Sequence, residues 1–171
     1  MVAKSLDVLV ALKLLAGGAG KTYAQLSKEL GMSASEVHAA VRRSTAAGLL
    51  DERTHLVLRK PLGEYLLHGV RYAFPARRGP VVRGVPTAHA APPLSSQVSA
   101  DDLPPVWPDP EGGTRGYSLE PLYKSVPYAA RSDSQLYELL ALVDAIRLGR
   151  AQERRLAEEE LRKRLEHDPV T

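Results

Sequence analysis

The sequence predicts a mainly α-helical chain with a small β wing, and three patterns support this fold class. Residues 22–50 have the pattern of two short helices joined by a tight turn, and residues 133–166 have a second strong helical pattern. Residues 55–59 have the pattern of a short strand. Residues 75–132 hold most of the prolines, whose fixed φ and missing amide exclude most regular helix. We therefore divide the chain into three parts: residues 1–74, 75–132 and 133–171.

The helix pair in residues 22–50 carries clear capping signals. Thr22 is a good N-cap for the first helix, and Gly31 suits the left-handed conformation that often ends a helix. Ser33 and Glu36 form a capping-box pattern at the start of the second helix, which we expect to span residues 33–47. The apolar residues of this second helix recur at inward positions. Five other residues of the helix are expected to face outward: Ser35, His38, Ala39, Arg42 and Arg43.

Two helices, a turn containing glycine and a basic outer face are typical of a helix-turn-helix. The run LSKELGMSASEVHAAVRRSTAAGLL resembles winged-helix regulators of the multiple-antibiotic-resistance-repressor (MarR) type. The resemblance covers roughly the first 75 residues and implies a DNA-binding domain. Ser44 departs from it, because these proteins usually place a buried leucine there. Either Ser44 bonds back to a helix carbonyl, or the helix packs less deeply than usual.

The flanking segments are expected to complete this domain. Residues 5–16 predict a first helix capped by Ser5, with Asp7 in its first turn, where an acid suits the helix dipole. After the helix pair, residues 51–54 supply turn chemistry and residues 55–59 a strand, which is where a two-stranded wing would lie. We expect Arg53, at the tip of this wing, to contact a DNA phosphate.

The charge distribution agrees with nucleic-acid binding. Residues 1–90 carry 13 Lys+Arg against 6 Asp+Glu, whereas residues 91–171 carry 10 against 14. We expect Ser35, His38, Ala39 and Arg42 to face base edges of double-stranded DNA, with Ser33 at the start of the same helix. Arg43, Lys28 and Arg53 are expected to hold phosphates. Further candidates for phosphate or partner contacts are Lys21, Arg77, Arg78 and Arg83.

Residues 75–132 leave two alternatives open. One is a disordered linker, because proline and glycine are frequent. The other, which we favour, is an ordered segment that wraps over the domain, because many apolar residues and the only tryptophan, Trp107, lie in it. Arg77, Arg78 and Arg83 form a basic cluster that would follow a phosphate backbone or bind the acidic surface of a partner.

Residues 133–166 predict two successive helices, with Ser132 or Asp133 as the cap and Gly149 as the break between them. Their apolar stripe must pack on the core, on a second copy or on another protein, and we expect it to join a homodimer. The run SVPYAARSDSQLYELLALVDAIRLGRAQERRLA also resembles uncharacterised bacterial winged-helix proteins, some of them encoded beside toxin-type partners. This resemblance implies an alternative role: an interaction module or antitoxin-like protein that binds its partner through residues 75–171.

Other classes of function find little support. We expect no membrane partner, since no run of about 18 apolar residues exists. The absence of cysteine favours a reducing compartment, so we expect a cytoplasmic protein. The GGAGKT run lacks the first glycine of a phosphate-binding loop, because Leu15 stands at that position. The histidines show no zinc-binding spacing, and we expect no metal, no cofactor and no enzyme activity.

Overall fold

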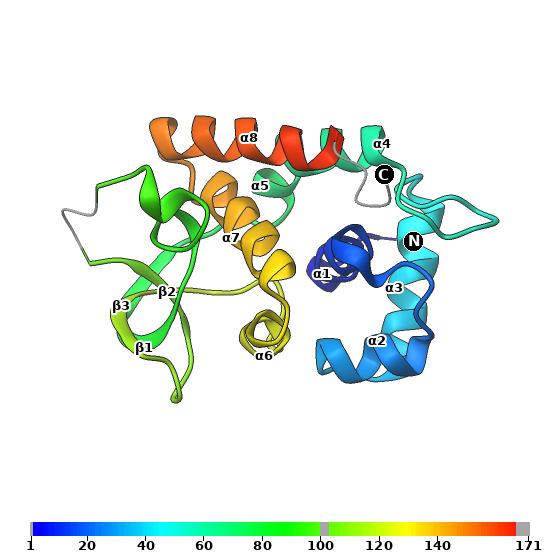
Figure 1. Cartoon of the computed structure of the whole chain (residues 1–171), viewed down its shortest axis with the longest axis horizontal. Helices are drawn as coiled ribbons and strands as arrows, with labels where there is room; N and C mark the ends of the chain where they lie inside the picture. The colour runs from blue at the N-terminus through cyan, green and yellow to red at the C-terminus, as the bar shows by residue number, and fades with distance from the viewer. Residues whose placement is uncertain (1, 100–102, 167–171) are drawn as a thin grey trace.

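The computed structural model describes residues 2–99 and 103–166, which form a mostly helical molecule with one small sheet. We call residues 5–73 the helical end and residues 78–119 the sheet end. Figure 1 shows helix α7 (Ser134–Leu148) between these two ends and helix α8 (Ala151–Glu166) along one side of both. The predicted class, mainly α with a small β component, agrees with this architecture at a coarse level.

The helical end is built from five helices, most of which the sequence predicted. Their bounds are α1 (Ser5–Lys13), α2 (Tyr23–Leu30), α3 (Ala34–Ala46), α4 (Arg59–His68) and α5 (Val70–Ala73). A π-helical turn, η1 (Leu14–Gly18), follows α1 directly. Ser5 is the first residue of α1 rather than its cap, because Lys4 takes the N-cap position and donates its amide to the Asp7 carboxylate at 2.9 Å.

The loop between α3 and α4 differs from the predicted two-stranded wing. A single antiparallel bridge joins Leu50 and Val57, and the residues between them form a turn. The Asp51 carboxylate holds this turn, accepting the amides of Arg53 at 2.9 Å and Thr54 at 2.8 Å. A hairpin this short has one bridge instead of a ribbon, and we call residues 50–57 the hairpin.

The β-structure lies instead in the proline-rich segment. Strand β1 (Arg78–Pro86) pairs antiparallel with both β2 (Pro105–Pro108) and β3 (Thr114–Leu119), and β2 pairs parallel with β3, so the three strands close into a small barrel. The segment therefore forms strands instead of the expected loop wrapped over the domain.

Proline and glycine explain how this segment accommodates strands. Pro80 lies at the register shift of β1, where a ladder amide is not needed. A Cβ at Gly84 would lie 2.0 Å from the carbonyl oxygen of Trp107, and one at Gly116 would lie 2.0 Å from that of Pro104. Only glycine allows the backbones of so small a barrel to approach this closely.

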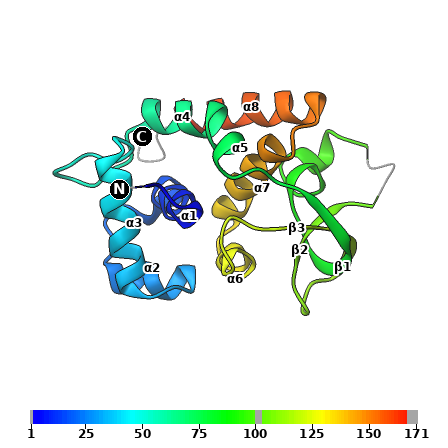
Figure 2. The ribbon, with the colours of Figure 1, turned by 180° about the vertical axis from the view of Figure 1, so that it is seen from behind.

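The rest of the middle segment connects the barrel to the helices. It contains two 3-10 turns, η2 (Ala88–Ala90) and η3 (Leu94–Ser96), and a short helix, α6 (Val126–Arg131). Pro127 lies in the first turn of α6, the one part of a helix where the missing amide has no cost. Figure 2, from behind, shows α5 leading into β1 beside α7.

The two C-terminal helices follow the predicted caps. Asp133 accepts the amide of Leu136 at 3.0 Å, and Gly149 ends α7 in the left-handed region at φ 84°. Nearly the whole of α7 from Leu136 onward is buried, and α8 packs on α7 and α4 through Ala157, Leu161 and Leu165. Residues 167–171 of the predicted C-terminal part lie outside the described residues.

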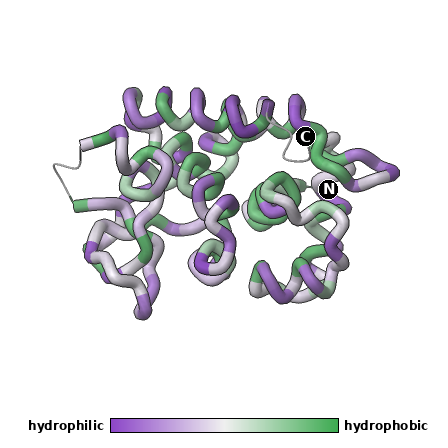
Figure 3. Tube along the Cα trace, viewed as in Figure 1, coloured by the Kyte–Doolittle hydropathy of each residue, from purple (hydrophilic) through white to green (hydrophobic). Residues whose placement is uncertain are grey.

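This packing decides among the three alternatives for the C-terminal stripe. The apolar residues of α7 and α8 are buried within one chain, and none of the large exposed hydrophobic side chains of the described residues lies on either helix. The apolar stripe therefore packs on the core of its own chain, which is the first of the three alternatives, and the homodimer stays a prediction. Figure 3 shows the result: α8 is largely hydrophilic along its outer side, whereas α1 is largely hydrophobic.

A buried polar cluster joins the barrel to α7. Asp144 is 1% exposed and accepts hydrogen bonds from Thr87 Oγ1, Trp107 Nε1 and Arg147 Nη1, each at 2.7 Å. Arg147 also donates to the carbonyl of Phe74 at 2.8 Å. Trp107 is fully buried, so the only tryptophan, which favoured an ordered segment, is part of the core. Among the described residues, no helix has the length and apolar character needed to cross a bilayer.

Candidate nucleic-acid interface

The turn between α2 and α3 is held by caps at both sides. Thr22 Oγ1 accepts the amide of Gln25 at 3.1 Å, and Gly31 ends α2 in the left-handed region at φ 67°. Ser33 Oγ accepts the amide of Glu36 at 3.1 Å, and the Glu36 carboxylate accepts the amide of Ser33 at 3.1 Å. These bonds confirm the predicted capping box and fix the direction in which α3 leaves the turn.

One face of α3 is buried and the opposite face is exposed. Val37, Ala40 and Val41 lie in the core, as the helical spacing predicted. Ser33, Ser35, His38 and Arg42 are exposed, and Ala39 is half-buried. The His38 ring meets the ring of Tyr23 edge-on, with 5.2 Å between centroids, which positions the imidazole beside α2. The exposed face thus presents hydroxyl, imidazole and guanidinium groups from one rigid helix.

Arg43 does not belong to this outer face. Its guanidinium binds the buried Asp7 carboxylate through three contacts of 2.8–3.1 Å, and its side chain is only 14% exposed. The hydrogen bonds to Asp7 raise the pKa of Arg43 further above its ordinary range. The expectation that Arg43 faces outward and holds a phosphate is therefore wrong: the residue ties α3 to α1.

Ser44 follows neither of the two alternatives raised by the sequence. It is 2% exposed, so α3 packs deeply at this position, and its hydroxyl has no hydrogen-bond partner in the described part of the protein. The neighbouring Thr45 donates to the carbonyl of Val41 at 2.7 Å instead. A buried hydroxyl without a partner costs stability.

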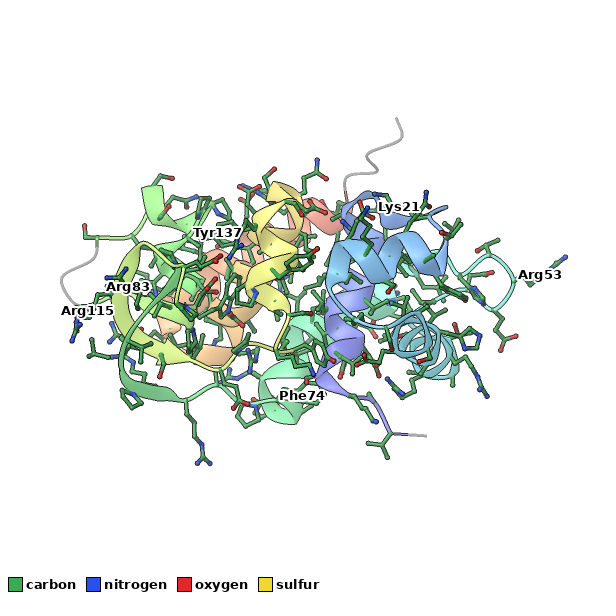
Figure 4. The ribbon with its side chains drawn as sticks, turned by 90° about the horizontal axis from the view of Figure 1, so that it is seen from below. Lys21, Arg53, Phe74, Arg83, Arg115 and Tyr137 are labelled. Atoms are coloured by element: carbon green, nitrogen blue, oxygen red, sulfur yellow. The ribbon has the colours of Figure 1, made fainter. Side chains whose placement is uncertain are left out.

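The hairpin places Arg53 at the far tip of the helical end. Figure 4 shows this side chain pointing away from the body of the molecule. The amides of Thr54 and Arg53 donate to Asp51 and lower the pKa of its carboxyl, so the turn is held by an ionised acid. Arg53 forms no ion pair with any described residue and is exposed.

The two lysines expected to reach phosphates differ in their surroundings. Lys21 Nζ lies 2.5 Å from Glu29 Oε1, and this hydrogen bond is the largest cause of the lowered pKa of Glu29. Lys28 is exposed on α2 and its ammonium has no carboxylate partner among the described residues. Lys28 is therefore the freer of the two to bind an anion.

The structure reveals a contact at the start of α3 that the sequence did not predict. The hydroxyl of Tyr123 donates to the Glu36 carboxylate, and this bond is the first cause of the lowered pKa of Glu36. Nearby, Tyr128 donates to the carbonyl of Lys28 at 3.1 Å, and a Cβ at Gly31 would lie 2.7 Å from its ring. The segment around α6 thus supports the helix pair from behind.

The arginines of the middle segment lie away from α3. Arg77, Arg78 and Arg83 are exposed at the start of β1 and along it. In Figure 4, Arg83 and Arg53 are at opposite ends of the molecule. The structure does not bring these predicted site residues together with α3.

Among the described residues, no group of three or more His, Asp or Glu side chains is placed to hold a metal ion. A cavity of about 390 Å³ lies between the hairpin and the start of α2. Its lining includes Leu14, Lys21, Tyr23, Val41, His55 and Leu56. Comparison of the chain with protein-family models, with curated proteins and with solved structures finds no match in any of the three.

Proposed function

We propose that the chain is a sequence-specific DNA-binding transcriptional regulator of winged helix-turn-helix type, with α3 as its recognition helix in the major groove. The observation that carries this proposal is the exposed face of α3, where Ser35, His38 and Arg42 project from a helix whose other face is buried. A rigid helix with adjacent hydroxyl, imidazole and guanidinium groups suits contacts with base edges.

Each residue of this face has a role in the proposal. Arg42 donates as a fork to O6 and N7 of a guanine, and Ser35 and His38 contact neighbouring bases. Lys28 on α2 and Arg53 on the hairpin bind phosphates on either side of α3 and set its position on the duplex. Ser33 acts through the cap, since its hydroxyl is already bonded to the amide of Glu36.

Two copies of the chain would present two α3 helices roughly 34 Å apart to an inverted repeat. The buried stripes of α7 and α8 do not join such copies, so a dimer would use another surface. The alternative function is a protein-interaction module that acts through residues 75–171, where the exposed large apolar side chains of the described residues are Val81, Leu103 and Tyr128.

The test is selection from fragmented genomic DNA, with sequencing of the retained fragments. We expect one enriched motif, and a loss of affinity for that motif of about 1–3 kcal/mol, or roughly 5- to 150-fold, in Arg42→Ala. Arg162→Ala is the control, because Arg162 is exposed on α8, far from α3 in the chain. No enriched motif, or equal losses in the two variants, would contradict the proposal and favour the interaction module.

A further inference from the structure

The outer face of β1 and β3 carries a pair of arginines directly opposite each other. In the antiparallel register Arg83 is the partner of Arg115, and Val81 is the partner of Tyr117 on the same face. Both arginines are exposed, and Figure 4 shows them together at the end of the molecule opposite Arg53. The guanidinium of Arg78 lies 4.3 Å from the centre of the Tyr117 ring, which adds a third cation to this face. We call these residues the β-face: Arg78, Val81, Arg83, Arg115 and Tyr117.

This arrangement is unfavourable for the isolated chain. Like charges directly opposite each other on an antiparallel pair destabilise the sheet. Arg131, on α6, shows how this protein neutralises a nearby arginine: it binds Asp109 at 3.0 Å and Glu111 at 3.1 Å. Neither Arg83 nor Arg115 forms an ion pair with any residue that the structure describes.

The barrel also holds the pair rigidly. Gly84 follows Arg83 and lies against the carbonyl of Trp107 in β2, and Gly116 follows Arg115 and lies against the carbonyl of Pro104, directly before β2. Because β1 and β3 are both held against this segment, they cannot separate to relieve the repulsion without breaking the barrel. The two guanidinium groups therefore stay on neighbouring strands, where they suit an anion with adjacent acceptor oxygens, as a phosphate has.

We propose that the β-face binds the phosphate backbone of a nucleic acid, at a site separate from α3. A single phosphate would engage only the Arg83–Arg115 pair, whereas Arg78 extends the cationic surface along β1, which suits successive phosphates of a polymer. The exposed Val81, 42% accessible, and the arginine stacked on Tyr117 provide surfaces for sugars and bases beside the phosphates. The site does not depend on the proposed reading of base edges by α3.

The test measures binding of the full chain to labelled single-stranded DNA, single-stranded RNA and duplex DNA of arbitrary sequence, at several salt concentrations. In Arg83→Gln/Arg115→Gln we expect the slope of log affinity against log salt to become shallower by about 0.7 per lost contact on single strands, or about 0.9 on duplex DNA. The nucleic acid that shows this change identifies the ligand. A slope that stays as in the wild type on all three would overturn the proposal.

Two further variants separate this site from general charge effects. Arg155→Gln/Arg162→Gln removes the same charge from the exposed side of α8, and we expect it to keep the wild-type slope; an equal change would overturn the proposal. Arg42→Ala is expected to lose motif selection while keeping the β-face contribution, so the two sites fail independently.

Arg115→Glu gives Arg83 an opposite charge across the strands. We expect its thermal midpoint to rise while nucleic-acid binding falls, because repulsion is replaced by attraction and the anion site is lost. A lower midpoint with unchanged binding would overturn the proposal and assign a structural role to the pair. Polyglutamate of equal charge is the last probe, and binding as tight as that of the nucleic acid would also overturn it, in favour of an acidic protein.

Discussion

The helical end and the sheet end of this molecule are held together in different ways. In the helical end, caps such as Ser33–Glu36 set each helix locally, and one ion pair, Asp7–Arg43, ties α3 to α1 at the edge of the core. In the sheet end, Thr87 and Trp107 instead donate to one buried carboxylate, that of Asp144 on α7, which also accepts from Arg147. Removal of a cap affects one helix end, whereas removal of a shared buried acceptor leaves all its donors without a partner. Substitutions in the two regions should therefore differ in how much they lower the free energy of unfolding.

The largest effect should come from Asp144→Ala. The change leaves Thr87, Trp107 and Arg147 without their acceptor in the core, and we expect the free energy of unfolding to fall by about 3–5 kcal/mol. Urea denaturation followed by Trp107 fluorescence measures this. Glu138→Ala, on the same helix but in a half-exposed pair with Arg164, should cost under about 1 kcal/mol. Similar losses in both variants would contradict the role of Asp144 as a shared buried acceptor.

Arg43→Ala should have the next largest effect and tests the ion pair of the helical end. It leaves the buried Asp7 carboxylate without its guanidinium, and we expect a loss of about 2–3 kcal/mol in the free energy of unfolding. The adjacent Arg42→Ala should change stability by less than about 0.5 kcal/mol, since Arg42 is exposed. Urea denaturation of the two variants gives the comparison, and a stable Arg43→Ala protein would return Arg43 to the outer face.

Gly84→Ala tests whether the barrel depends on close backbone approach. The added methyl group would lie 2.0 Å from the carbonyl oxygen of Trp107, and we expect a loss of about 1–3 kcal/mol in thermal or urea unfolding. Gly113→Ala is the matched control, because nothing lies within 4 Å of its Cβ and it should be nearly neutral. Equal behaviour of the two glycines would show that the strands separate easily.

The smallest effect should come from Tyr123→Phe, which removes the donor to Glu36 and should cost about 1 kcal/mol at neutral pH. The pKa of Glu36 is lowered from its ordinary value of 4.5, first by this hydrogen bond. Its contribution is therefore present above pH 4.5 and is lost as the pH falls through the folded-state pKa.

The difference in stability between wild type and Tyr123→Phe should shrink as the pH falls below 4.5. Denaturation curves between pH 3 and 7, a range chosen about the ordinary pKa of a carboxyl group, measure this. Tyr128→Phe is the control, since its hydroxyl donates to the carbonyl of Lys28, which does not titrate. A difference that is constant with pH would show that Tyr123 acts through packing alone.

The candidate site could be predicted in part because its caps and its helix period are local. Ser33 and Glu36 are three residues apart, and the helical spacing placed Val37 inside and His38 outside. Arg43 was placed wrongly because its partner, Asp7, is 36 residues away and no local pattern links them. The Tyr123–Glu36 bond is still more distant in sequence, at 87 residues, and had no local signal.

The same contrast holds for the β-structure. The strand pattern after α3 was read as a wing, but the hairpin closes after one bridge because Asp51 holds a tight turn. The strands lie in the proline-rich segment, where the sequence excluded most regular helix and predicted no strand. They form because glycines at close approaches allow three backbones to pair. Strand pairing between residues as far apart as Arg78 and Leu119 depends on partners that a local pattern does not contain.

By itself, the sequence determined where several helices begin and end, because capping and helical periodicity act within a few residues. For this reason the sequence predicted four helix caps that the structure confirms: Thr22, Gly31, Asp133 and Gly149. Only the tertiary structure decided that Arg43 faces inward, that α7 and α8 bury their stripes within the chain, and that Arg83 lies opposite Arg115. Each of these depends on segments that meet only when the chain folds, and the energies involved belong to pairs of residues rather than to either residue alone.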